Sequence, residues 1–122
     1  MDMLYYIYIG SNRAIIDHLS KIAGGMFMAV SSCNKAAKVI DGIRERYNTS
    51  ILYEESTPQK DSQNITFLHK RFPRVYIILI TEGLQKEHRK LYLQAGVNNT
   101  LSPMASEESL QQMTKFLQLR KE

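Results

Sequence analysis

The sequence predicts an α/β fold: a doubly wound, five-stranded parallel sheet of strand order 2-1-3-4-5, with helices on both faces. Two continuous apolar runs, Leu4–Ile9 and Val75–Ile80, are rich in β-branched and aromatic residues, which is typical of strands covered on both faces. Between such runs the apolar spacing changes to that of an amphipathic helix. Strict alternation with short connections favours parallel pairing through right-handed crossovers.

The first half of the chain shows two strand and helix pairs. Leu4–Ile9 is the first strand, and the helix after it ends before Gly24, with its apolar face made of Ile15, Ile16, Leu19 and Ile22. Phe27–Val30 follows the Gly24-Gly25 pair and forms a weaker second strand. The segment Asn34–Tyr47 is predicted as the second helix because one face collects Ala36, Ala37, Ile40, Ile43 and Tyr47.

The second half repeats the pattern three times. Ile51–Tyr53 is a short third strand, and the polar stretch after it leads into a helix with apolar positions Ile65, Leu68 and Phe72. Val75–Ile80 is the fourth strand, followed by a helix with Leu84, His88, Leu91 and Ala95 on one face. Polar residues interrupt Val97–Leu101, so we expect this fifth strand at an edge, like the second. The last helix begins after Ser106, a good N-cap residue, and buries Leu110, Met113 and Leu117.

Composition limits the classes of function. A chain of 122 residues, 43% hydrophobic and 23% charged, fits one globular domain over residues 1–122. A net charge of +4 does not by itself select a nucleic-acid partner. The single cysteine, Cys33, cannot form an internal disulfide and no secretory signal pattern is visible, so we expect a cytoplasmic location.

Two further expectations come from the apolar runs and from the end of the chain. The longest runs have six residues, and a membrane-spanning helix needs ~20, so we expect no direct insertion into a membrane. The sequence ends in the basic, helical pattern KFLQLRKE without a stop signal. We therefore expect these residues to be the N-terminal part of a longer polypeptide.

In a doubly wound sheet, functional groups lie at the carboxyl ends of the central strands, beside the first strand. The segments at these positions are Gly10-Ser11-Asn12, Glu54-Glu55, Thr81-Glu82 and Leu101-Ser102-Pro103.

These strand ends resemble the receiver domain of two-component response regulators, and the resemblance covers essentially the whole chain. In that family a phospho-accepting aspartate ends the third strand, with a proline four residues later, and a Thr or Ser ends the fourth. Here ILYEESTP places Glu54 at the accepting position and Pro58 at the proline, and IILIT places Thr81 at the switch hydroxyl. The segment AGVNNTLSPM is similar to the family's fifth-strand region, with Ala95-Gly96 matching.

The departures from the family pattern concern its phosphorylation chemistry. Gly10 and Ser11 stand where the family has an acidic pair, Pro103 where it has a lysine, and Thr100 where it has a switch aromatic residue. Formation of an aspartyl phosphate needs Mg²⁺ held by carboxylates and a further positive charge. The resemblance therefore implies a degenerate receiver, or pseudo-receiver, that is not phosphorylated. We expect no catalytic residue, no metal ion and no cofactor.

Two roles for Glu54 are compatible with this interpretation. Its longer side chain would place a carboxylate where a metal or phosphoryl oxygen would lie, and so mimic the phosphorylated state. Mimicry also needs the residues that respond to phosphorylation in the family. Of these, Thr81 is present and the switch aromatic is not, which favours a rigid docking module without a switch. The purely structural alternatives are a solvated carboxylate for Glu54 and also for Glu55, and a helix-capping hydroxyl for Thr81.

The resemblance implies a regulatory protein–protein interaction domain of bacterial signal transduction. The partner would be a protein or a fused output domain, of DNA-binding, histidine kinase or transferase type. Receivers commonly use the face between the fourth and fifth helices for dimerisation or output contacts, and here that face would contain Lys86, Arg89, Lys90, Tyr92, Glu108 and Gln112. Its mixed charge would allow a homodimer across a twofold axis.

Two alternatives stay open at this stage. The backbone N–H groups of Gly10, Ser11 and Asn12 face a helix N-terminus, where a flavodoxin-like module would bind phosphate, a nucleotide or a flavin. The turn matches neither a Walker loop nor a dinucleotide-binding fingerprint. The other alternative is a residually active phosphorelay receiver. The histidines fall on three different predicted helices, which argues against a metal site.

Overall fold

A computed structural model describes residues 3–44, 46–115 and 117. The strands are β1 (Tyr5–Ile9), β2 (Met26–Val30), β3 (Thr49–Glu54), β4 (Tyr76–Ile80) and β5 (Asn99–Leu101). The helices are α1 (Arg13–Ile22), α2 (Cys33–Asp41), α3 (Pro58–Arg71), α4 (Lys86–Ala95) and α5 (Glu107–Thr114), with a short 3₁₀ helix, η1 (Arg46–Asn48), before β3. Strands and helices alternate as the sequence predicts.

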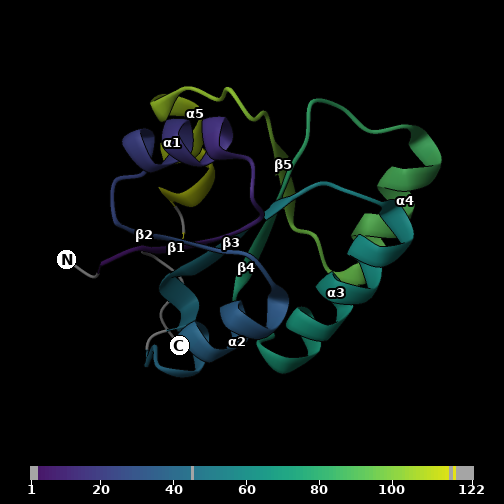
Figure 1. Ribbon diagram of the computed structural model, residues 1–122, viewed down its shortest axis with the longest axis horizontal. Helices are drawn as coiled ribbons and strands as arrows, with labels where there is room; N and C mark the ends of the chain where they lie inside the picture. The colour runs from purple at the N-terminus through teal and green to yellow at the C-terminus, as the bar shows by residue number, and fades with distance from the viewer. Residues whose placement is uncertain (1–2, 45, 116, 118–122) are drawn as a thin grey trace.

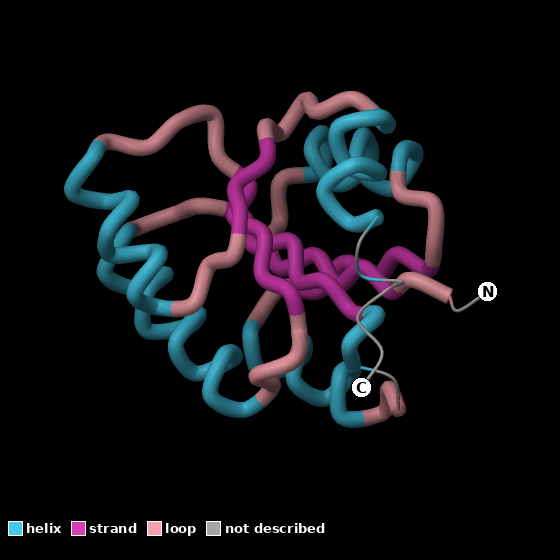
Figure 2. Tube along the Cα trace, turned by 180° about the vertical axis from the view of Figure 1, so that it is seen from behind, coloured by secondary structure: helices cyan, strands magenta, loops and turns pink. Residues whose placement is uncertain are grey.

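The strands form one parallel sheet of order β2-β1-β3-β4-β5, which confirms the predicted topology. Figures 1 and 2 show the sheet between two helical layers, with α1 and α5 on one face and α2, α3 and α4 on the other. All positions of β4 are buried, whereas β2 and β5 are partly exposed, as expected for edge strands. The carboxyl ends of the central strands therefore meet at one edge of the sheet.

Each face of the sheet has its own apolar core. Ile7, Ile51 and Ile77 pack under α2, α3 and α4, whereas Tyr8 and Ile78 face α1 and α5. Burying a residue of this size contributes about 1.5–3 kcal/mol relative to leaving it exposed. Because both faces are covered, the central strands contain continuous apolar runs instead of alternating ones.

Two helix boundaries differ from the sequence-based prediction. The second helix ends at Asp41 and does not reach Tyr47, because Gly42 follows and the Ile43 N–H bonds to Ile40 O, closing the last turn. The fourth helix begins at Lys86, and Leu84 packs against the core from the preceding loop. In both places an apolar residue of a connection fits the helical spacing, which periodicity alone cannot distinguish from a helix.

The predicted helical end of the chain is only partly covered. Residues 116 and 118–122 lie outside the described residues. In the part that is described, no helix combines the length and the apolar character that crossing a bilayer requires.

Candidate functional site

The carboxyl edge of the sheet has a cavity of about 520 Å³ that brings together three of the predicted site residues, Glu54, Thr81 and Pro103. The cavity is also lined by Asn12, Glu55, Glu82 and Met104, among others. Its described lining residues include three glutamates and no lysine, arginine or histidine. The side chains that line the cavity therefore make it negative. A phosphorylatable receiver, in contrast, needs cations at this place.

The Glu54 carboxylate folds back over the end of β1. Its Oε1 accepts a hydrogen bond from the Tyr8 hydroxyl at 2.6 Å and from the backbone N–H of Asn12 at 2.9 Å. Bonds to an ionised acceptor are stronger than bonds between neutral groups. Glu54 is consequently an anchored, half-buried group, and the interpretation as a solvated carboxylate is wrong.

Gly10 provides the space that Glu54 occupies. A Cβ at position 10 would lie 2.5 Å from Glu54 Oε1 and 2.6 Å from Glu54 Cβ, far inside contact distance. The backbone angle φ of Gly10 is +156°, a conformation that other residues rarely adopt. The absence of a side chain at position 10 and the glutamate at position 54 are therefore complementary. Ser11, at the second acidic position, is exposed.

The turn after β1 uses the N–H groups of Gly10 and Asn12 internally. Gly10 N–H donates to Val30 O at 3.0 Å, and Asn12 N–H donates to Glu54. Asn12 is the N-cap of α1, because its Oδ1 accepts from Ile15 N–H at 3.2 Å. The Glu54 carboxylate thus takes the place that the small-ligand hypothesis assigned to an external anion, which counts against that hypothesis.

Tyr8 is a site residue that the sequence analysis treated only as part of a strand. Its burial, together with the adjacent Glu54 carboxylate, raises the pKa of the Tyr8 phenol well above its usual value. The phenol therefore stays protonated and acts as a donor to Glu54. Its position in a strand predicted to be buried could have identified it, because a buried tyrosine needs a hydrogen-bond partner for its hydroxyl.

Thr81 bonds to the second glutamate of the pair. Its hydroxyl donates to Glu55 Oε1 at 2.6 Å and accepts from Gly83 N–H at 3.1 Å. Thr81 is 7% exposed and Glu55 is half-buried. The expectation of a solvated Glu55 is therefore wrong, and the two glutamates contact different neighbours: Glu54 contacts β1 and α1, and Glu55 contacts the end of β4.

Asp61 is a buried carboxylate that the sequence analysis missed. It is 1% exposed and accepts three hydrogen bonds: Tyr53 OH at 3.1 Å, Ser56 N–H at 2.7 Å and Tyr92 OH at 2.7 Å. Burial and the nearby Asp61 carboxylate raise the pKa of the Tyr92 phenol. An aspartate in the first turn of a helix is expected on the surface. Only the packing of α3 against β3 and α4 surrounds Asp61 with donors.

The predicted interaction face needs one correction. Tyr92 is 1% exposed and lies in the core beneath α4, because it shares the inner side of the helix with Ala95. The other predicted residues of this face are exposed; they are Lys86, Arg89, Lys90, Glu108 and Gln112, and we call them the α4–α5 face. Leu93 and Met104 add exposed apolar side chains at 58% and 67%.

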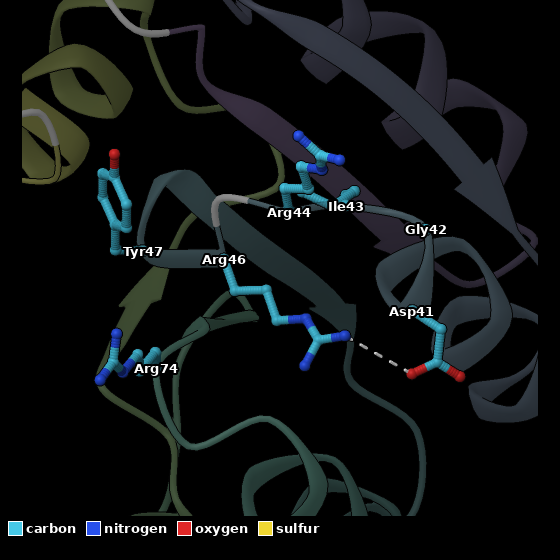
Figure 3. Close-up of a pocket in the computed structure, with 7 residues that line it drawn as sticks. All are labelled: Asp41, Gly42, Ile43, Arg44, Arg46, Tyr47 and Arg74. Atoms are coloured by element: carbon cyan, nitrogen blue, oxygen red, sulfur yellow. Dashed lines mark ion pairs between the residues drawn. The ribbon is translucent and has the colours of Figure 1, made fainter.

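A second cavity, of about 480 Å³, is lined by several arginines and is drawn in Figure 3. The guanidinium groups of Arg44, Arg46 and Arg74 point in different directions, and that of Arg46 points toward Asp41 at 3.8 Å. Arg46 also stacks over the Phe72 ring at 5.2 Å. The arginines do not converge on one point, so the cavity lacks the arrangement of an anion site.

No group of three or more His, Cys, Asp or Glu side chains within the described ranges is placed to hold a metal ion. His18 is engaged in packing, since its Nε2 lies 2.7 Å from Ala105 O.

No family model and no curated protein matches the sequence. Solved structures match it over nearly its full length. A CheY-like protein (tadZ) from Pseudomonas aeruginosa PAO1 has 13% identity and a TM-score of 0.79, with 100% of this chain and 98% of that one covered. The signal receiver domain of an HD domain-containing protein from Pseudomonas fluorescens Pf-5 has 13% identity and a TM-score of 0.78, with coverage of 96% and 88%.

A putative pilus assembly-related protein from Burkholderia pseudomallei K96243 is also similar, at 14% identity and a TM-score of 0.76, with 94% of this chain and 89% of that one covered. At such identities structural similarity establishes the fold and not the activity. The order of the strands, the two helical layers and these neighbours agree: the chain has the CheY-like fold of response regulator receiver domains.

Proposed function

We propose that this domain is a pseudo-receiver, which takes up no phosphoryl group and regulates a fused or partner output domain through protein contacts. The observation that carries the proposal is the Glu54 carboxylate, which is bonded to Tyr8 and to the Asn12 N–H at the centre of the site.

The chemistry of phosphoryl transfer supports this proposal. Mg²⁺ requires several oxygen ligands in an octahedral arrangement, usually with one or two carboxylates. Glu54 Oε1 already accepts two hydrogen bonds, and Gly10 and Ser11 contribute no carboxylate. Pro103 provides no positive charge that would stabilise the phosphoryl group during its transfer. An incoming phosphoryl group would meet three glutamates in this cavity without a compensating cation among its described lining residues.

The contacts of Thr81 favour a docking module over mimicry of the phosphorylated state. The Thr81 hydroxyl bonds to Glu55 and not to Glu54, so it does not follow the carboxylate at the accepting position. Thr100, at the position of the switch aromatic, is exposed. We infer that the domain is a non-catalytic docking module and that the carboxyl edge of its sheet does not switch between two conformations.

The α4–α5 face is the contact surface of this proposal. Lys86, Arg89 and Lys90 make its α4 side basic, and Glu108 makes its α5 side acidic. A second copy related by a twofold axis would pair α4 of one chain with α5 of the other. The other occupant is an output domain of a longer cytoplasmic polypeptide; the Pseudomonas fluorescens neighbour is itself the receiver domain of an HD domain-containing protein.

An amide-resolved NMR titration tests the proposal. Residues 1–122 are titrated with Mg²⁺ to millimolar concentration and then with beryllofluoride, a phosphoryl analogue, beside a phosphorylatable receiver as positive control. The expected result is that the amides of Glu54, Thr81 and α4 do not move. Glu54→Ala is the matched control variant, since any shift that persists in it comes from non-specific binding.

Joint shifts of Glu54 and Thr81 in the wild type that are lost in Glu54→Ala would contradict the proposal. The domain would then be a residually active phosphorelay receiver, which is one of the alternatives that the sequence leaves open. Acetyl phosphate with Mg²⁺ gives an independent reading by mass spectrometry, with no added phosphoryl group expected on the intact protein.

A further inference from the structure

We propose that Asp61 and Tyr92 are positioning residues for α4: their buried hydrogen bond sets the orientation of this helix and therefore of the α4–α5 face. The identification of that face as a contact surface rests on the proposed function. The positioning itself is a property of the fold and is tested separately.

The bond is short, buried and formed by an ionisable acceptor. Tyr92 OH donates to Asp61 Oδ2 at 2.7 Å, and both residues are 1% exposed. A buried carboxylate is strongly unfavourable unless donors surround it. The donors to Asp61 are two phenols and one backbone N–H, and Tyr92 is one of these three. Removing one donor leaves part of a buried charge without a partner.

Few side chains of α4 are buried, and Tyr92 is one of them. Only Tyr92 and Ala95 are buried among the ten residues of α4, and its N-cap residue, Gln85, makes no side-chain capping bond. The helix lies beside α3 at the side of the molecule, as Figure 1 shows. Tyr92 and Ala95 mark the inner side of α4, so a directional bond at Tyr92 constrains the rotation of the helix about its axis. That rotation decides where Lys86, Arg89 and Lys90 point.

The same carboxylate also holds the loop that follows β3. Asp61 Oδ2 accepts from Ser56 N–H at 2.7 Å, directly after Glu54 and Glu55. Three consecutive residues, at the end of β3 and directly after it, are therefore each tied to a different neighbour: Glu54 to β1 and α1, Glu55 to Thr81, and Ser56 through Asp61 to α4. The loop and α4 share one buried acceptor.

Two matched substitutions separate positioning from general stabilisation. Tyr92→Phe removes the bond to α4 and keeps the aromatic ring in the core. Tyr53→Phe removes another phenol from the same carboxylate, but on β3, so that α4 keeps its bond. Amide hydrogen exchange is measured by NMR for α4 and for the buried strand β4, and the chemical shifts of Lys86, Arg89 and Lys90 are followed.

In Tyr92→Phe we expect the α4 amides to exchange at least about tenfold faster relative to those of β4, since a hydrogen bond to a charged group holds the helix against local opening. The amides of Lys86, Arg89 and Lys90 shift as well. In Tyr53→Phe the ratio of α4 to β4 exchange stays at its wild-type value. The β4 amides also verify that each variant is folded.

An equal loss of protection in α4 and β4 of Tyr92→Phe, or no change in α4, would overturn the proposal, because the bond would then contribute only to global stability or not at all. A selective effect of Tyr53→Phe on α4 would overturn it too. The outcome is independent of the beryllofluoride titration, which uses the wild-type protein and Glu54→Ala and leaves the bond to Tyr92 intact.

Discussion

At the residue scale, Gly10 and Glu54 act as a pair. Glu54 needs space above the end of β1 to reach Tyr8 and the N-cap of α1, and only a residue without a side chain at position 10 leaves that space. A side chain at position 10 is therefore incompatible with the observed position of Glu54.

We expect Gly10→Ala to lower the free energy of unfolding by about 1–3 kcal/mol, the usual cost of overpacking. The new Cβ collides with the Glu54 carboxylate. In a Glu54→Gly background the same substitution should cost less, because no side-chain atom at position 54 is left to collide with the new Cβ and only the strain at φ +156° persists. Urea unfolding of the four proteins of this cycle measures the difference; an equal cost in both backgrounds would assign the whole effect to backbone strain.

Two aspartates on neighbouring helices illustrate how burial decides the energy of a carboxylate. Asp41, on α2, pairs with Arg71 on α3 at 2.7 Å, and both side chains are more than 40% exposed. Asp61 is 1% exposed and bonded to three donors. The exposed pair is screened by water, whereas the buried group depends on its partners.

Asp61→Asn should therefore destabilise the protein by about 1–3 kcal/mol, because an amide leaves at least one of the three donors without an acceptor. Asp41→Asn should cost no more than about 1 kcal/mol, and less in high salt. Thermal and urea unfolding in low and high salt provide the comparison. A larger loss for Asp41→Asn would contradict this ranking.

At the scale of elements, α4 and α5 present opposite charges on either side of β5. Lys90 and Glu108 are exposed representatives of the two sides. If the domain self-associates through this face, Lys90→Glu should raise the dimer dissociation constant, because it places like charges across the twofold axis. The charge-swapped double variant with Glu108→Lys should recover part of the affinity. Sedimentation equilibrium measures both, and unchanged association in the single variant excludes the homodimer for this face.

At the scale of the whole molecule, four buried phenols connect stability to alkaline pH. Burial raises the pKa of Tyr6, Tyr8, Tyr53 and Tyr92 above the value of an exposed tyrosine. The folded chain thus holds these protons more tightly than the unfolded chain does. The stabilisation is complete below the unfolded pKa of about 10 and is lost as pH rises above it.

We expect the free energy of unfolding to fall above about pH 10, by up to about 1.4 kcal/mol per pH unit for each phenol. Urea unfolding as a function of pH measures the slope. In Tyr8→Phe the fall in the free energy of unfolding per pH unit should be smaller by the contribution of one phenol. This comparison separates the tyrosines from lysines, which titrate in the same pH range. A slope that is the same in Tyr8→Phe and in the wild type would contradict the assignment for Tyr8.

The large features of this molecule follow from patterns local in the sequence. Continuous apolar runs, helical spacing and the weak second and fifth strands were sufficient for the sheet order, and the strand-end segments did converge on one cavity. Local patterns failed where apolar residues outside an α-helix fitted the helical spacing, at Ile43, Tyr47 and Leu84. They also misplaced Tyr92, because a tyrosine is compatible with either side of a helix.

The sequence by itself determined the fold and the identity of the groups at the carboxyl edge, since both depend on residue types at regular spacing along the chain. Only the tertiary structure decided what those groups bind. Tyr8 and Glu54 are separated by 46 residues, and Asp61 and Tyr92 by 31. Hydrogen bonds over such separations depend on the crossovers that bring β1 beside β3 and α3 beside α4, and on the side-chain packing between them, which no local spacing encodes.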